Sequence, residues 1–217
     1  MKKQFVVIGL GRFGSSVATT LSEMGYEVLG IDIDEKRVHE HLDVITHVVQ
    51  ADATDEHALK ALGIRNFDIV VIAIGEDIQA SIMATLIIKE MGVPMVVVKA
   101  RNELHRKLLQ KIGADKVIFP ERDMGVRVAH NLISPNILDF IEFAEDYSLA
   151  DISVPPSMVG KSLAELNIRA RYGCNVIAIK SGKHINIAPR AEDRLQAGDV
   201  MVVIGHNDDL QRLEENS

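Results

Sequence analysis

The first 120 residues alternate short, nearly unbroken apolar runs with stretches of helical periodicity. The apolar runs predict strands at residues 4–9, 27–32, 47–50, 67–74, 95–100 and 116–119. Helical patterns begin near Phe13, Asp34, Asp55, Asp77 and Glu103. Runs such as IVVIAI and MVVVKA lack polar alternation, which is typical of a parallel sheet covered by helices on both faces. Residues 1–120 are therefore predicted to form a Rossmann-like, doubly wound α/β domain with its ligand crevice at the carboxyl ends of the strands.

The pattern changes after residue 120. Residues 121–145 are predicted to form a helical crossover, as two helices broken at Ser134–Pro135, because proline disfavours helix for the residue before it. Apolar side chains recur there at helical spacing: Met124, Val128, Leu132, Ala129 and Ile133. A stripe of this kind serves either as core or as a subunit contact, and we favour the contact, which makes the segment a dimerisation linker.

From residue 146 to 217 the chain is rich in strand patterns, at SLADISVP, NVIAIKSG, KHINIAP and GDVMVVIG. The stretches SLAELNI and DDLQRLEE predict short helices. These residues are expected to form a second, smaller α+β domain. A domain of this size lies near the lower limit for an independent core, so association would stabilise it.

The segment GLGRFG carries three glycines with the spacing G-x-G-x-x-G directly after the first predicted strand. Gly9 permits the tight turn, Gly11 allows the backbone to approach a pyrophosphate, and Gly14 lets the first helix pack closely on the sheet. Asp32 lies 23 residues after Gly9, where a carboxylate accepts hydrogen bonds from the ribose of an adenine nucleotide. This combination predicts a nucleotide site, and Asp32 argues against NADP because it repels a 2′-phosphate.

Arg12 places a guanidinium in the loop, where it can pair with a phosphate. Since backbone amides already serve a pyrophosphate, this arginine suits a terminal phosphate, as in ADP or ATP, or a phosphate bound by a neighbouring subunit. Asp34 assists at the ribose, caps the next helix, or does both. Further candidates, each of which is otherwise a helix cap or salt-bridge partner, are Phe13, Ile33, Asp52, Ala53, Ile74, Gly75, Glu76, Lys99, Ala100, Arg101, His105 and Glu121. Glu121 is also the candidate ligand for Mg²⁺ or another divalent cation, because a carboxylate near polyphosphate needs a bridging cation.

Composition excludes several classes of function. The chain has a net charge of −7, which is unsuited to general nucleic-acid binding. Cys174 is its only cysteine, which excludes an intrachain disulfide, and the apolar run GCNVIAI favours a core thiol. No segment reaches the roughly 20 apolar residues that cross a bilayer, and the N-terminal apolar run is too short for a signal peptide. We therefore expect a cytoplasmic protein.

The second domain lacks the residue patterns of a catalytic centre. Its histidines, His184 and His206, have no partner at nucleophile–base or metal-ligand spacing, and His39, His41 and His47 straddle a helix end and a strand start. The first domain carries a nucleotide-binding motif, and the second carries no pattern of catalytic residues. This combination favours a sensor over an enzyme. The alternative is a small NAD-dependent oxidoreductase. A redox-sensing repressor is disfavoured because the chain has neither a helix-turn-helix pattern nor a basic face.

The sequence resembles the RCK family, also called KTN or TrkA-N/TrkA-C, and is most similar to the regulatory subunits of Ktr-type bacterial potassium uptake systems. The resemblance rests on GLGRFG, VLGIDID, QADATDEHALKALGIRNFDIVVIAIGEDIQAS, KIGADKVIFPERDMG and the second-domain stretch from VGKSLAEL to VMVVIG. It covers nearly the whole chain. Cys174 replaces a more usual aliphatic residue, and Asp34 stands where asparagine also occurs.

The resemblance implies an octameric ring of dimers, docked peripherally on the inner face of the membrane against a potassium-translocating subunit. It implies activation by ATP, with ADP or NAD(H) in the same cleft, Arg12 at the terminal phosphate, Asp32 at the ribose and Glu121 at a divalent cation. It also implies cyclic di-AMP as a second ligand in the C-terminal domain. The matching residues are Ile168, Arg169, Asn175, Val176, Ile177 and Pro189.

Overall fold

The computed structural model describes residues 2–133, 137–144 and 146–215. The chain divides into two compact units, Met1–Pro120 and Glu121–Ser217. No helix within the described ranges is both long enough and apolar enough to cross a membrane.

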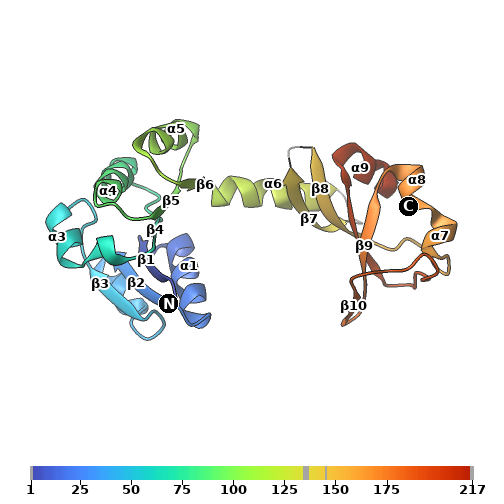
Figure 1. Cartoon of the computed structure of the whole chain (residues 1–217), viewed down its shortest axis with the longest axis horizontal. Coiled ribbons are helices and arrows are strands. Elements are labelled where there is room, and N and C mark those ends of the chain that lie inside the picture. Colours follow the sequence, from blue (N-terminus) through green and yellow to red (C-terminus); the bar gives the residue numbers. More distant parts are fainter. Residues whose placement is uncertain (1, 134–136, 145, 216–217) are drawn as a thin grey trace. The chain divides into compact units, whose positions relative to one another are not determined.

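The first unit is built on a six-stranded parallel sheet with the strand order β3-β2-β1-β4-β5-β6 (Figure 1). Its strands are β1 (Gln4–Ile8), β2 (Glu27–Asp32), β3 (His47–Gln50), β4 (Ile69–Ile72), β5 (Met95–Lys99) and β6 (Lys116–Ile118). All six predicted strands are present, although β1, β4, β5 and β6 are shorter than predicted. The order reverses between β1 and β4, where doubly wound sheets bind their ligands. The Rossmann-like fold is confirmed.

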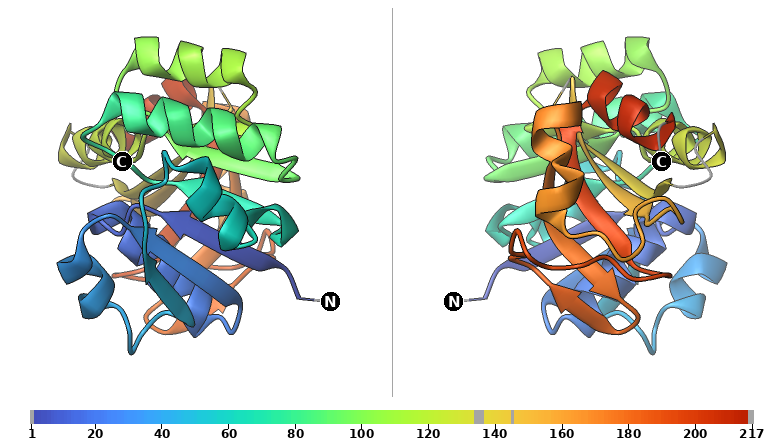
Figure 2. Two further views of the ribbon diagram at one scale, coloured as in Figure 1. Left: turned by 90° about the vertical axis from the view of Figure 1, so that its left-hand side faces the viewer. Right: turned by 90° about the vertical axis from the view of Figure 1, so that its right-hand side faces the viewer.

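Helices cover both faces of this sheet (Figure 2, left). They are α1 (Arg12–Glu23), α2 (Glu35–Glu40), α3 (Glu56–Ala61), the 3₁₀ turn η1 (Ile64–Asn66), α4 (Ile78–Glu90) and α5 (Glu103–Ile112). Along β1, Val6 and Ile8 enter the core that α3, α4 and α5 cover, whereas Val7 enters the core beneath α1. This alternation explains why the strands are apolar on both faces.

The N-termini of these helices differ in one respect. Side chains accept backbone N–H bonds in the first turns of four helices: Asp34 at α2, Asp55 at α3, Asp77 at α4 and Asn102 at α5. Helix α1 follows Gly11, has no side-chain cap and carries no acidic residue in its first turn. Its leading N–H groups are therefore the ones that the protein leaves to another acceptor.

The predicted helical linker is wrong in its second half. Helix α6 spans Pro120–Ile133, but strand β7 (Ile137–Ala144) stands where a second helix was expected, and Ser134–Pro135 lies outside the described residues. The strand pairs antiparallel with β8 (Tyr147–Ser153), with Ile141 opposite Leu149. The stretch ILDFIEFA contains aromatic and β-branched residues that suit a strand, and pairing with β8 decides its conformation over helical spacing.

The second unit is a five-stranded sheet in the order β10-β9-β11-β8-β7, with antiparallel neighbours throughout. Its remaining elements are α7 (Leu163–Leu166), α8 (Ile168–Tyr172), β9 (Asn175–Ser181), β10 (His184–Asn186), β11 (Val200–His206) and α9 (Asn207–Glu215). Helices α8 and α9 lie together over one face of the sheet (Figure 2, right). The smaller α+β domain is thereby confirmed.

Cys174 belongs to the core of this second unit, as the sequence predicted. Its side chain is fully buried among residues of β8, β11 and α9. Burial raises the pKa of the thiol to about 11, so the neutral form prevails at neutral pH. A Cβ added at Gly205 would lie 2.8 Å from its Sγ atom, which explains the glycine on β11. Cys174 therefore serves packing rather than chemistry.

Candidate functional site

The glycine loop lies between β1 and α1, at the point where the strand order reverses. Gly9 has φ +91°, and a Cβ there would lie 3.0 Å from the carbonyl carbon of Ala73. A Cβ at Gly14 would lie 1.8 Å from the carbonyl oxygen of Gly9. Both glycines are therefore required by the fold itself, the first by its left-handed backbone and the second by close packing.

Gly11 differs from these two glycines. Its φ is −68°, which any residue adopts, and a Cβ there would meet only the Nη1 atom of Arg37, at 3.9 Å. The protein alone thus gives no reason for a glycine at this position. A ligand that approaches the backbone closely does, because the space above Gly11 adjoins the uncapped N-terminus of α1, which attracts anions.

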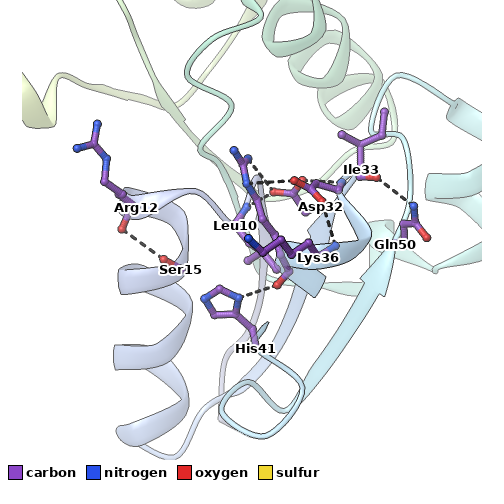
Figure 3. A network of polar contacts seen from close by, with 10 residues as sticks. Leu10, Arg12, Ser15, Asp32, Ile33, Lys36, His41 and Gln50 are labelled. Carbon is purple, nitrogen blue, oxygen red and sulfur yellow. Dashed lines mark hydrogen bonds and ion pairs between the residues drawn. The ribbon is translucent and has the colours of Figure 1, made fainter. Parts of the chain in front are cut away.

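Asp32 ties the end of β2 to this loop (Figure 3). Asp32 is 4% exposed. Its Oδ2 accepts the Leu10 N–H at 2.6 Å, and its Oδ1 accepts the Asp34 N–H at 2.9 Å. The structure thus places the carboxylate beside the glycine loop, as the motif predicts. There its bonds to the backbone hold the loop in shape.

Arg37, on α2, is a site residue that the sequence analysis missed. Its Nη1 lies 3.5 Å from Asp32 Oδ2, and its Nε lies 3.8 Å from Asp34 Oδ2. One signal for it was available, because Arg37 follows Asp34 by one helical turn. Its contact with Asp32 depends on how α2 is placed relative to β2, and the spacing of residues does not contain that information.

Several candidates beside Asp32 have structural roles. Asp34 Oδ1 accepts the Lys36 N–H at 2.9 Å, so Asp34 is the cap of α2 that was the alternative interpretation. Asp52 accepts both the N–H and the hydroxyl of Thr54, which stabilises the turn after β3. Ile33 is exposed, whereas Ala53 is buried in the core.

Cationic side chains reach the same edge of the sheet from β5 and α1. Lys99 Nζ lies 5.8 Å from the ring centroid of Phe13 and 3.6 Å from the position of a Cβ on Gly75. Arg12 is exposed, and its side chain points away from the Asp32 carboxylate (Figure 3). These two side chains add positive charge to the carboxyl edge of the sheet.

The β4 and β5 loops are linked through Arg101 and His105. Arg101 Nη1 donates to the Glu76 carbonyl oxygen at 3.1 Å, and the Arg101 N–H donates to His105 Nδ1 at 3.3 Å. Burial lowers the pKa of His105, which is 2% exposed, so the neutral ring that can accept this bond is favoured. The histidine is thus a support beneath the loop. Ile74 is half-buried and Ala100 is buried beside it.

The remaining candidates lie in the second unit. Glu121 is exposed in the first turn of α6. No three His, Cys, Asp or Glu side chains of residues 2–133, 137–144 and 146–215 gather as a metal site. Of the six residues matched to a second ligand, Ile168 is buried in the core and the other five are exposed or half-buried.

The structure thus brings together one set of the predicted residues. The glycine loop, Asp32, Phe13, Gly75 and Lys99 lie at the carboxyl edge of the first sheet. Such an edge offers an anion cradle, a ribose acceptor and neighbouring cations, which is the chemistry of nucleotide binding. It presents no nucleophile paired with a base among its described residues.

Comparison with known proteins agrees with this geometry. The TrkA-N domain family matches residues 5–120, and the TrkA-C domain family matches residues 149–217. The chain is 51% identical over 215 residues to Ktr system potassium uptake protein C of Bacillus subtilis strain 168, covering 99% of this chain and 97% of that protein. It is 46% identical over 212 residues to Ktr system potassium uptake protein A of the same strain, covering 98% and 96%.

A solved structure, the GsuK channel bound to NAD, has a TM-score of 0.55 and 25% identity. The match covers 99% of this chain but 38% of that chain, so this chain spans well under half the length of the channel. The resemblance drawn from the sequence motifs is confirmed. With both domain families matched and near-complete overlap with two Ktr proteins, the chain belongs to the TrkA-N/TrkA-C family.

Proposed function

We propose that this protein is a nucleotide-sensing regulatory subunit, without enzymatic activity, that gates a potassium-translocating membrane protein. It acts from the cytoplasmic side, ATP favours the active state, and ADP lowers activity. The observation that carries the proposal is the space above Gly11, beside an uncapped helix N-terminus and the Asp32 carboxylate. The 51% identity to a Ktr potassium uptake protein supports potassium as the ion.

The proposed ligand spans the carboxyl edge of the first sheet. The ribose meets Asp32, the first phosphates lie over Gly11 and the N-terminus of α1, and the chain of phosphates runs toward Arg12 and Lys99. Arg12 points away from Asp32, which suits a terminal phosphate or one held by a neighbouring copy. NAD or NADH fits the same cleft, and the GsuK channel structure bound to NAD supports this ligand.

The direct test is potassium flux in liposomes that carry the cognate membrane subunit and this protein. Flux should rise with ATP and fall with ADP, because a ligand shifts a conformational equilibrium by its differential affinity for the two states. Moving that equilibrium from 1:99 to 99:1 needs about 5.5 kcal/mol, which repeated sites can supply together. Flux that is equal with ATP, with ADP and without nucleotide would reduce the protein to a passive scaffold.

Arg12 should distinguish the two nucleotides. Arg12→Ala is expected to weaken ATP binding by about 10- to 150-fold, since a hydrogen bond to a charged group contributes about 1.5–3 kcal/mol. ADP binding should change far less, because ADP lacks the γ-phosphate that Arg12 is proposed to bind. Isothermal titration with both nucleotides measures the difference, and Arg106→Ala, which removes an α5 arginine paired with Glu103, is the control. An equal loss of affinity for ATP and ADP would show that Arg12 does not bind the terminal phosphate of ATP.

The protein is proposed to form dimers that assemble into an octameric ring, with α6 as a contact. Met124 is 53% exposed, Val128 is 47% exposed and Leu132 is 79% exposed, and a lone chain would leave this apolar stripe in water. Light scattering should give a mass well above the 23.9 kDa of one chain. Val128→Asp with Leu132→Asp should lower that mass, and a monomeric wild type at micromolar concentration would contradict the ring.

Two further ligands complete the proposal. Glu121 is proposed to supply one carboxylate to Mg²⁺ or another divalent cation, whose other ligands come from outside this chain or from phosphate oxygens. Glu121→Gln should then remove any dependence of ATP binding on the divalent cation. Cyclic di-AMP is proposed to bind the second domain at Arg169, Asn175 and their neighbours on β9.

A further inference from the structure

A side chain borders the space that a nucleotide needs at the glycine loop. Arg37 Nη1 is the one atom within 4 Å of a Cβ on Gly11, at 3.9 Å. The same nitrogen lies 3.5 Å from Asp32 Oδ2, the oxygen that accepts the Leu10 N–H. The guanidinium therefore lies against the carboxylate of the proposed ribose site and at the edge of the proposed phosphate site.

In the absence of a ligand, Arg37 supplies the positive charge that the buried Asp32 carboxylate otherwise lacks. The Asp32 side chain is 3% exposed, and the backbone N–H groups of Leu10 and Asp34 provide hydrogen bonds but no full positive charge. A buried carboxylate without a counter-charge is costly. The Arg37 side chain is 46% exposed, so its outer part can leave toward solvent while its Nε remains near Asp34.

We propose that Arg37 is a displaceable competitor for the nucleotide site. In the empty protein its guanidinium pairs with Asp32 beside the space over Gly11, and an incoming ribose replaces it at the carboxylate. The inference rests on the proposed nucleotide site and adds a contact that holds the empty state and opposes binding of every adenine nucleotide alike.

This arrangement fixes the sign of a mutational effect. Removing Arg37 raises the free energy of the empty protein, which loses the pair with Asp32, and leaves the bound state nearly unchanged. Affinity is the difference between these two states, so Arg37→Ala should bind nucleotide more tightly. If Arg37 instead contacted the phosphates, loss of its positive charge would weaken binding. A competitor and a ligand contact therefore predict opposite results for Arg37→Ala.

The test compares Arg37→Ala with Lys36→Ala by titration with ATP and with ADP. Lys36 is the neighbouring cation, its side chain is 83% exposed, and its Nζ pairs at 3.9 Å with Glu40 rather than with Asp32. Arg37→Ala should tighten both ligands by a common factor of about two- to fivefold, the range for a partly exposed ion pair. Lys36→Ala should leave both affinities unchanged or slightly weaker. Without nucleotide, Arg37→Ala should also melt at a lower temperature than the wild type.

Weaker or unchanged binding of ATP and ADP by Arg37→Ala would overturn the inference and make Arg37 a ligand contact or a bystander. Arg37→Gln, which keeps most of the side chain, gives the same comparison if the alanine variant folds poorly. A wild type that binds neither nucleotide would instead defeat the proposed function. Binding by the wild type that Arg37→Ala weakens defeats the competitor role alone.

Discussion

Replacing Gly14 with alanine is expected to unfold the first unit. The new Cβ would lie 1.8 Å from the Gly9 carbonyl oxygen and 2.9 Å from the Ala73 Cβ, and neither the backbone oxygen nor β4 can move without disturbing the sheet. Overpacking a core typically costs 1–3 kcal/mol, and a collision with backbone exceeds that range, so we expect a loss of at least about 3 kcal/mol. Thermal melting followed by circular dichroism measures it.

Gly11→Ala is the matched control, three residues earlier in the same loop. Its Cβ meets only the end of the flexible Arg37 side chain, so the melting temperature without nucleotide should stay within a few degrees of the wild type. Nucleotide binding should nevertheless fall sharply, because the methyl group occupies the space of the phosphates. Equal stability of both variants would show that Gly14 is not a packing requirement.

Asp32→Ala is expected to damage both the fold and the site. It leaves the N–H groups of Leu10 and Asp34 without their acceptor inside the protein, at a cost of about 3 kcal/mol in the free energy of unfolding. It also removes the proposed ribose acceptor, so ATP and NADH binding should be lost together. Urea denaturation and isothermal titration report the two effects separately.

The neighbouring carboxylate provides the comparison. Asp34→Ala removes a partly exposed helix cap and should cost about 1 kcal/mol, with nucleotide affinity nearly preserved. If Asp34→Ala abolished binding while Asp32→Ala did not, the two carboxylates would have been assigned in the wrong order. The experiment therefore separates a cap from a ligand group that lies two residues away.

Local patterns predicted most of the first unit. The apolar runs located all six strands, and the spacing of Gly9, Gly11, Gly14 and Asp32 located the loop, because consecutive backbone geometry determines each of these features. The motif also gave the three glycines separate roles, with Gly9 and Gly14 needed by the fold and Gly11 by a ligand. The structure supports this division through atoms that the motif does not contain, those of Ala73, directly after β4, and of Arg37 on α2.

Features that depend on distant partners were missed or misassigned. The stretch 137–144 has apolar residues compatible with helix, and its pairing with β8 makes it a strand. Arg37 reads as an exposed helical arginine until α2 places it against Asp32. His105 reads as a crevice residue, yet it is buried and supports the Arg101 backbone. In each case a tertiary contact overrides the local pattern.

The caps of α2, α3, α4 and α5 also limit where an anion can bind in the first unit. In a doubly wound sheet the N-termini of these helices all open toward the carboxyl edge, and each carries a similar partial positive charge. In α2, α3, α4 and α5 a carboxylate or amide oxygen of the cap residue accepts a first-turn N–H bond. That N–H group is then not available to a phosphate. Among helices α1 to α5, only α1 leaves its first N–H groups without a side-chain acceptor, so we expect a polyphosphate at this edge to bind there. The caps of the other four helices then contribute to selectivity as much as the uncapped N-terminus of α1 does.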